Sequence, residues 1–213
     1  MPTHGYSAGR GASSLQVDSG VLMGSSRGGC LGNPTTVVAQ RFVLQDSKGV
    51  VRAALGINDQ GEVLLALMDA RGQGRADMSV TAEGLPRFEL FDSAGNTRAL
   101  INVDEQDTPS LALYDGRMAR AIVSVMGQGP YVALADEQSR RQITLGAGPG
   151  MAQILFEDAS NSGTCAIGIG ANRTVGMTVA DSKGETKVEA LLQPDGKAGF
   201  MAVHLDGQVS TLP

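Results

Sequence analysis

The chain has 213 residues, of which 17 are basic and 22 acidic, and a formal net charge of −5 at pH 7. This acidic balance excludes nucleic acid from the expected partners, because polyanions bind basic surfaces. Aromatic residues make up only 4%, tryptophan is absent and glycine occurs 29 times, which predicts a thin aliphatic core. No segment approaches the roughly 18 apolar residues of a membrane span, and no signal peptide is recognisable at the N-terminus.

The first forty residues are rich in glycine and serine and contain one acidic residue, Asp18. No repeat unit fits them, so residues 1–40 are interpreted as an N-terminal arm and residues 41–213 as a β-repeat domain. Two interpretations of the arm stay open. It is either a disordered tail or a segment that orders by adding to the sheet edge of a neighbouring copy.

From residue 41 onward one pattern recurs at intervals of about 23 residues. "FVLQDSKGVVRAALGI", "LALMDARGQGRADMSV" and "FELFDSAGNTRALINV" are three consecutive examples. A fixed period of 20–50 residues is typical of repeat architectures, whose units bury their apolar faces against neighbours. Eight units are expected, with aspartates at Asp46, Asp69, Asp92, Asp115, Asp136, Asp158, Asp181 and Asp206.

Each unit alternates apolar and polar residues before and after its aspartate, as in Phe88 and Leu90, then Ala99, Ile101 and Val103. Period-two alternation predicts two short, half-buried β-strands. An Asp-x-x-Gly turn joins them, in which the carboxylate accepts backbone N–H bonds and the glycine adopts a positive φ. The structural turn residues are Asp46 and Gly49, Asp69 and Gly72, Asp92 and Gly95, and Asp181 and Gly184.

The expected fold is therefore all-β: an elongated tandem array of about eight β-hairpins. A solenoid with parallel rungs is the alternative. Solenoid stacking would place Arg52, Arg75 and Arg98 in one like-charged column about 4.8 Å apart, which is unfavourable. The turn chemistry also favours antiparallel hairpins.

An open sheet of this size would leave its apolar face in water, so association with other copies is the simplest way to cover it. The opposite face is not purely polar, because Met68, Phe91 and Tyr114 share the position before the turn aspartate. This stripe is interpreted as an association surface. The alternative is that arginine stems from the adjacent strand cover it.

No catalytic, cofactor-binding or metal site is expected, and the protein is not expected to be an enzyme. "GYSAG" around Ser7 matches a hydrolase nucleophile motif but has no strand before it. His4 and His204 are the only histidines, and His204 is assigned to a strand of the last repeat. Cys30 and Cys165 have no metal-like or redox-like spacing, although one bridge between them stays open.

The pattern F/L-x-L-x-D-x-x-G-x-x-R-A-x-L resembles tandem β-repeats of poorly characterised bacterial proteins. The resemblance implies a structural or surface-exposed role. The expected function is a self-associating subunit of an oligomeric stalk or an extracellular fibre, as a trimer or an open-ended polymer, with an extracellular or cell-surface location. The alternative is a lectin-like or receptor-binding module that presents its repeated loops to surface glycans.

Overall fold

The computed structural model describes residues 38–127, 129–138, 140–158, 160, 162–170, 172–204 and 206–212. Except for residues 38–40, the N-terminal arm expected from the sequence lies outside the described residues. Ser7, His4 and Cys30 also lie outside them.

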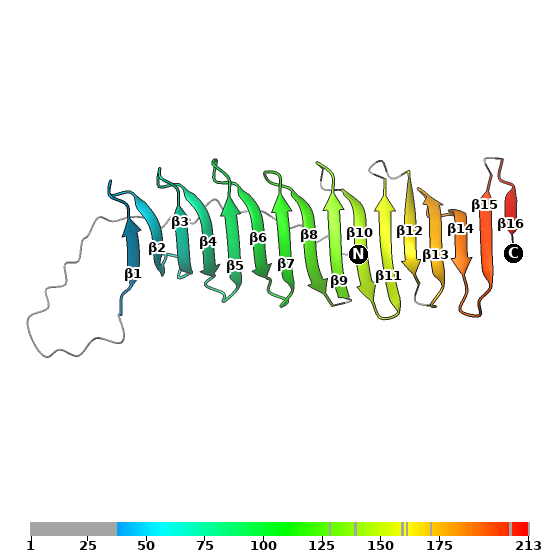
Figure 1. The fold of residues 1–213 in the computed structure, drawn as a ribbon, viewed down its shortest axis with the longest axis horizontal. Coiled ribbons are helices and arrows are strands. Elements are labelled where there is room, and N and C mark those ends of the chain that lie inside the picture. The colour runs from blue at the N-terminus through cyan, green and yellow to red at the C-terminus, as the bar shows by residue number, and fades with distance from the viewer. Residues whose placement is uncertain are drawn as a thin grey trace, which may run out of the picture. The chain divides into compact units, whose positions relative to one another are not determined.

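Sixteen antiparallel strands follow one another in chain order in one open sheet, as the alternating arrows of Figure 1 show. No helix occurs among the described residues. The all-β prediction is confirmed, and so is the choice of antiparallel hairpins over a solenoid. Within β1–β5 and within β6–β16, consecutive strands pair antiparallel, because the connections are tight turns that can only reverse the chain direction.

The described residues fall into two units, divided between Asn96 and Thr97. The strands of the first unit are β1 (Arg41–Gln45), β2 (Val51–Ile57), β3 (Val63–Met68), β4 (Gly74–Val80) and β5 (Pro86–Phe91). The strands of the second unit are β6 (Thr97–Val103), β7 (Pro109–Tyr114), β8 (Ala119–Met126), β9 (Gly129–Ala135), β10 (Arg141–Gly148), β11 (Met151–Glu157), β12 (Gly163–Ile169), β13 (Val175–Asp181), β14 (Thr186–Leu192), β15 (Ala198–Val203) and β16 (Val209–Leu212).

The alternation in the sequence becomes two different faces in each unit. On β3, Leu64 and Ala66 are buried, whereas Val63, Leu65 and Leu67 are exposed. Successive side chains of a strand point to opposite sides of the sheet, so one face collects the second set. The face that carries Val63, Leu65 and Leu67, and the matching face of β6–β16, is called the apolar face below. The other is called the opposite face.

The hairpin turns hold their aspartates by backbone hydrogen bonds. In the β1–β2 turn the Gly49 N–H donates to the Asp46 carbonyl oxygen at 3.0 Å, and the Asp46 N–H donates to the Val50 carbonyl oxygen at 2.9 Å. The Asp46 carboxylate also accepts the N–H groups of Lys48 and Val50. Gly49 has a φ of 79°, and Gly72, Gly95 and Gly184 have φ values of 77°, 84° and 78°. These are left-handed conformations that a Cβ disfavours, which explains why glycine recurs there.

The last turn differs from the one that the sequence pattern predicts. It begins at His204, whose N–H donates to the Gln208 carbonyl oxygen and whose carbonyl accepts the Gly207 N–H. His204 follows Asp181 by twenty-three residues, so the usual repeat spacing is kept, and Asp206 lies inside the turn. The assignment of His204 to a strand was wrong, because the positive φ of Gly207 (83°) fixes the start of the turn three residues earlier.

Candidate association surface

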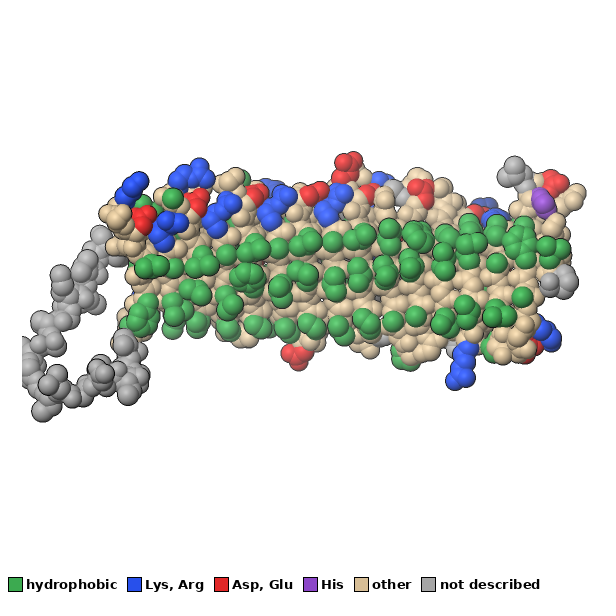
Figure 2. Space-filling model, in the orientation of Figure 1, with side chains coloured by type: hydrophobic (Ala, Val, Ile, Leu, Met, Phe, Trp, Pro, Cys, Tyr) green, Lys and Arg blue, Asp and Glu red, His purple; other side chains and the backbone are tan. Residues whose placement is uncertain are grey.

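In β6–β16 the apolar face consists of three rows that run across the strands, and Figure 2 shows such rows as parallel bands of hydrophobic side chains. Antiparallel partners directly opposite each other point to the same face, so the strand register defines each row. The row nearest the aspartate turns is called the turn row, the next the middle row and the last the far row.

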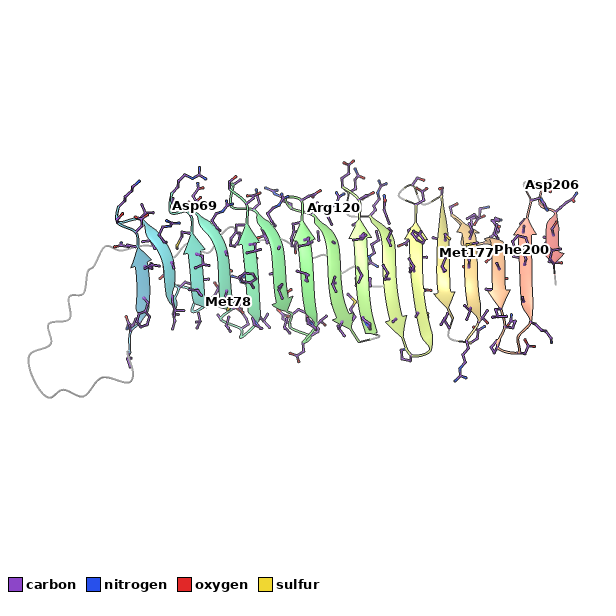
Figure 3. The ribbon with its side chains drawn as sticks, viewed as in Figure 1. Asp69, Met78, Arg120, Met177, Phe200 and Asp206 are labelled. Carbon is purple, nitrogen blue, oxygen red and sulfur yellow. The ribbon has the colours of Figure 1, made fainter. Side chains whose placement is uncertain are left out.

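The turn row consists of Ala99, Leu113, Ala121, Leu134, Ile143, Phe156, Cys165, Val179, Val188, Ala202 and Ser210. The middle row consists of Ile101, Leu111, Val123, Val132, Leu145, Ile154, Ile167, Met177, Ala190, Phe200 and Leu212. The far row consists of Val103, Pro109, Val125, Pro130, Ala147, Ala152, Ile169, Val175, Leu192 and Ala198. Met177 and Phe200 of the middle row are labelled in Figure 3.

No residue of these three rows is buried in the single chain, and many are exposed. Ile101 is 52% exposed, Ile167 46% and Phe200 39%. Eleven strands at about 4.8 Å and three rows at about 6.7 Å give this part of the face an area of roughly 1,000 Å². The largest apolar patch of an ordinary soluble monomer covers about 300–600 Å². The apolar face of β6–β16 is therefore larger than the patches usual on monomers.

The first unit presents the same kind of face on β1–β5. Its middle row, by register, is Phe42, Leu55, Leu65, Met78 and Phe88. Phe42 is 47% exposed and Met78 58%. Both units therefore expose an apolar face of the same kind.

The opposite face of β3–β5 carries a charged cluster centred on Arg87. The Arg87 guanidinium lies 3.6 Å from the Glu62 carboxylate and 3.9 Å from that of Glu89, and it donates to the Ser79 hydroxyl at 2.9 Å. Asp77 is buried on the same face, and its burial raises the pKa of its carboxyl group, with Arg87 opposing the shift and Glu62 adding to it. One guanidinium thus binds two carboxylates and one hydroxyl group and lies near a third carboxyl group whose pKa is raised, which is the character of a structural network.

A shallow hollow of about 660 Å³ lies over β10–β14 near the aspartate turns, lined by Asp158, Asp181, Lys187 and Cys165 among others. Its two aspartates, Asp158 and Asp181, already have partners. The Asp158 carboxylate accepts hydrogen bonds from the hydroxyl groups of Ser160 and Ser162. These hydrogen bonds hold the pKa of Asp158 well below its ordinary range. Lys187 lies 3.1 Å from the Asp181 carboxylate. An acid or base already engaged in this way is poorly placed for proton transfer.

The stripe of Met68, Phe91 and Tyr114 lies on the opposite face. Phe91 and Tyr114 are each 5% exposed, and Met68 is half-buried. The register pairs Ala53 with Leu67, Ala76 with Leu90 and Ala99 with Leu113. Continued by one residue, it sets an arginine of the preceding strand beside each member of the stripe: Arg52 beside Met68, Arg75 beside Phe91 and Arg98 beside Tyr114.

The Arg52 Nε–H donates to the Met68 carbonyl oxygen at 3.3 Å. Arginine stems therefore run past this stripe, and the large exposed apolar surface is the other face. Tyr114 is too buried to serve as a sugar platform, and the Tyr131 ring is occupied by Arg141, whose guanidinium carbon lies 5.7 Å from the ring centre.

Cys165 occupies the turn row, between Phe156 and Val179 of the neighbouring strands, and carries a free thiol. The sequence left open a bridge from Cys165 to Cys30, which lies outside the described residues. The period-two alternation of Cys165 with Ile167 and Ile169 is the signal that would have placed it on the apolar face. This natural thiol lies within the candidate association surface.

Among the described residues, no group of three His, Cys, Asp or Glu side chains is arranged to hold a metal ion. The same residues include no helix of the length and apolarity needed to cross a membrane. Fold and surface together define the chain as an antiparallel β-meander whose two units each expose an apolar face. Neither a protein-family model nor a curated protein matches the chain.

Proposed function

We propose that the chain is a structural protein that associates with copies of itself through the apolar face, as the subunit of an oligomeric stalk or fibre. The observation that carries this proposal is the continuous apolar face of about 1,000 Å² on β6–β16. A stable protein–protein interface buries about 800 Å² per partner, so this face is large enough for one.

The energetics favour association. At about 25 cal/mol per Å², burial of such a face contributes up to roughly 25 kcal/mol per copy, an upper bound. The loss of translational and rotational freedom on association costs about 4–15 kcal/mol. The face carries no charged side chain in any of its three rows on β6–β16, so its burial leaves no unpaired charge.

The test introduces one aspartate on either face of the same strand. Ile154 lies in the middle row and is 37% exposed, whereas Gln153, the preceding residue, points to the opposite face between Gly146 and Gly168. Because Ile154 is partly exposed in the single chain, a charge there should leave a monomer folded. Sedimentation equilibrium across a concentration series should show a multiple of 22.0 kDa for the unmodified protein and for Gln153→Asp.

Ile154→Asp should raise the dissociation constant of the oligomer at least tenfold, because association would bury a charge that has no partner. The measured mass should therefore move toward that of the monomer. Circular dichroism confirms that both variants keep their β-structure. A mass of 22.0 kDa for the unmodified protein at every concentration contradicts the proposal. An equal response of the two variants contradicts it as well.

A further inference from the structure

The three rows of the apolar face differ in side-chain size. Among the eleven residues of the middle row on β6–β16 only Ala190 is small. The turn row includes three alanines, a cysteine and a serine, and the far row includes three alanines and two prolines. The five middle-row residues of β1–β5 are all large as well. The space above the face must therefore be deepest over its centre line and shallower toward both margins.

We infer that three copies enclose this space, with β6–β16 of each copy forming one wall of a triangular prism and the apolar faces pointing inward. This inference rests on the proposed self-association and adds its number and arrangement. The walls of such a prism converge at the corners, where the turn row and the far row lie, and small side chains fit there. Middle-row side chains point toward the axis, where the space is deepest.

The width of the apolar strip matches this geometry. Three rows at about 6.7 Å make a wall about 20 Å wide, and the centre of a triangle of that side lies about 6 Å from each wall. Stacked sheets lie about 10 Å apart, so each contributes a side-chain layer of about 5 Å. Three walls thus fill the centre, whereas four walls of this width would leave it about 10 Å from each wall and hollow. Two facing sheets would offer all rows the same depth, which does not explain the size difference.

Three-fold symmetry makes a specific prediction about contacts. Identical copies around one axis bring the same strand of each copy to the same height. At each corner the turn row of one copy then meets the far row of the next. On β12 these rows are represented by Cys165 and Ile169. Within one strand, residues 165 and 169 are about 13 Å apart, too far for a disulfide, which needs Cα atoms within about 4.4–6.8 Å.

The experiment uses the full chain with Cys30→Ser and Ile169→Cys, oxidised with diamide and separated on a non-reducing gel. The expected product is a covalent trimer closed by three disulfides. Val175→Cys in place of Ile169→Cys is the second variant, because Val175 is the direct cross-strand partner of residue 169 in the far row. Ala166→Cys, on the opposite face of β12, is the control and should yield no covalent oligomer.

The outcomes separate this inference from the proposed function. A covalent dimer that persists when no free thiol remains in either far-row variant, or any covalent dimer from Cys165 alone in Cys30→Ser, overturns the three-fold arrangement and leaves self-association standing. So does a sedimentation mass of the unmodified protein that is a multiple of 22.0 kDa other than three. A trimeric mass without covalent trimer in either variant overturns the pairing of turn row with far row. A monomeric mass overturns both proposals.

Discussion

Gly168 of β12 lies so close to Gln153 of β11 that a Cβ added at Gly168 would be 2.6 Å from the Gln153 Cα and would overlap the Ala152 carbonyl oxygen. Both neighbours belong to the backbone of the adjacent strand, which cannot yield without disturbing the ladder. Gly168 is not in the left-handed region, so the close approach of two strands, and not a turn, requires glycine at this position.

Gly168→Ala should therefore destabilise the protein by about 1–3 kcal/mol, the cost typical of forcing extra atoms into a packed site. Gly146 lies in the same cross-strand row, and a Cβ there would meet nothing within 4 Å. Gly146→Ala is the matched control and should change stability by less than about 0.5 kcal/mol. Urea unfolding at one fixed protein concentration measures both. Similar midpoints for the two variants would show that the strand contact does not restrict residue 168.

Gly95→Val should destabilise the protein by more than about 1 kcal/mol. Gly95 has a φ of 84° in the β5–β6 turn, and a β-branched residue strongly resists positive φ. Because a Cβ there would meet no atom within 4 Å, the cost is one of backbone conformation alone. Thermal unfolding by circular dichroism provides the measurement, and an unchanged Tm would contradict this explanation of the turn.

Arg173→Gly tests the same principle in the opposite direction. Arg173 has a φ of 64° and holds the turn position before β13 that glycine holds in most of the other turns. Relief of the left-handed strain should stabilise the folded state by about 1–2 kcal/mol. This gain should exceed the free-energy cost of the extra conformational entropy that glycine gives the unfolded chain, so the Tm should rise. Arg173→Ala keeps the strain and should give no increase. A lower Tm for Arg173→Gly would indicate that the arginine side chain stabilises the turn.

Asp77→Asn should stabilise the protein at pH 7. Burial raises the pKa of Asp77 above its ordinary value of 3.8, so the folded state disfavours the ionised form that dominates at pH 7. The increase in the free energy of unfolding should be largest above the folded-state pKa of Asp77. It should disappear below pH 3.8, where the carboxyl group of the unmodified protein is protonated in the folded and the unfolded state.

Asp69→Asn is the control of opposite sign. The Arg71 and Gln73 backbone N–H groups lower the pKa of Asp69, so its ionised form stabilises the fold above 3.8, and this stabilisation is lost as the pH falls through the folded-state pKa. Figure 3 shows Asp69 at the turn edge of the sheet. Urea midpoints recorded from pH 3 to pH 8 should therefore separate the two variants. A pH-independent difference from the unmodified protein would contradict the assignment for either residue.

Local chemistry in the sequence predicted the hairpins. The alternation around Phe88 and Leu90 predicted strands, and the Asp46 and Gly49 pair predicted a turn, because both signals arise within a few neighbouring residues. The exposed apolar face was likewise expected, since alternation of period two separates the side chains of any strand onto two faces. The later repeats depart from the pattern and were harder to align. The sequence therefore predicted Asp206 as the start of the last turn, which in the structure begins at His204.

The register between strands could not be predicted in the same way, because it depends on where each turn begins and on the bulges beside it. Register places Cys165 between Phe156 and Val179 and sets Ala99 opposite Leu113. It also reveals that the large side chains gather in the middle row. Alternation along one strand indicates which face of the sheet a side chain occupies. The neighbours of that side chain across the sheet belong to other strands, so only the pairing of the strands in three dimensions brings a row together.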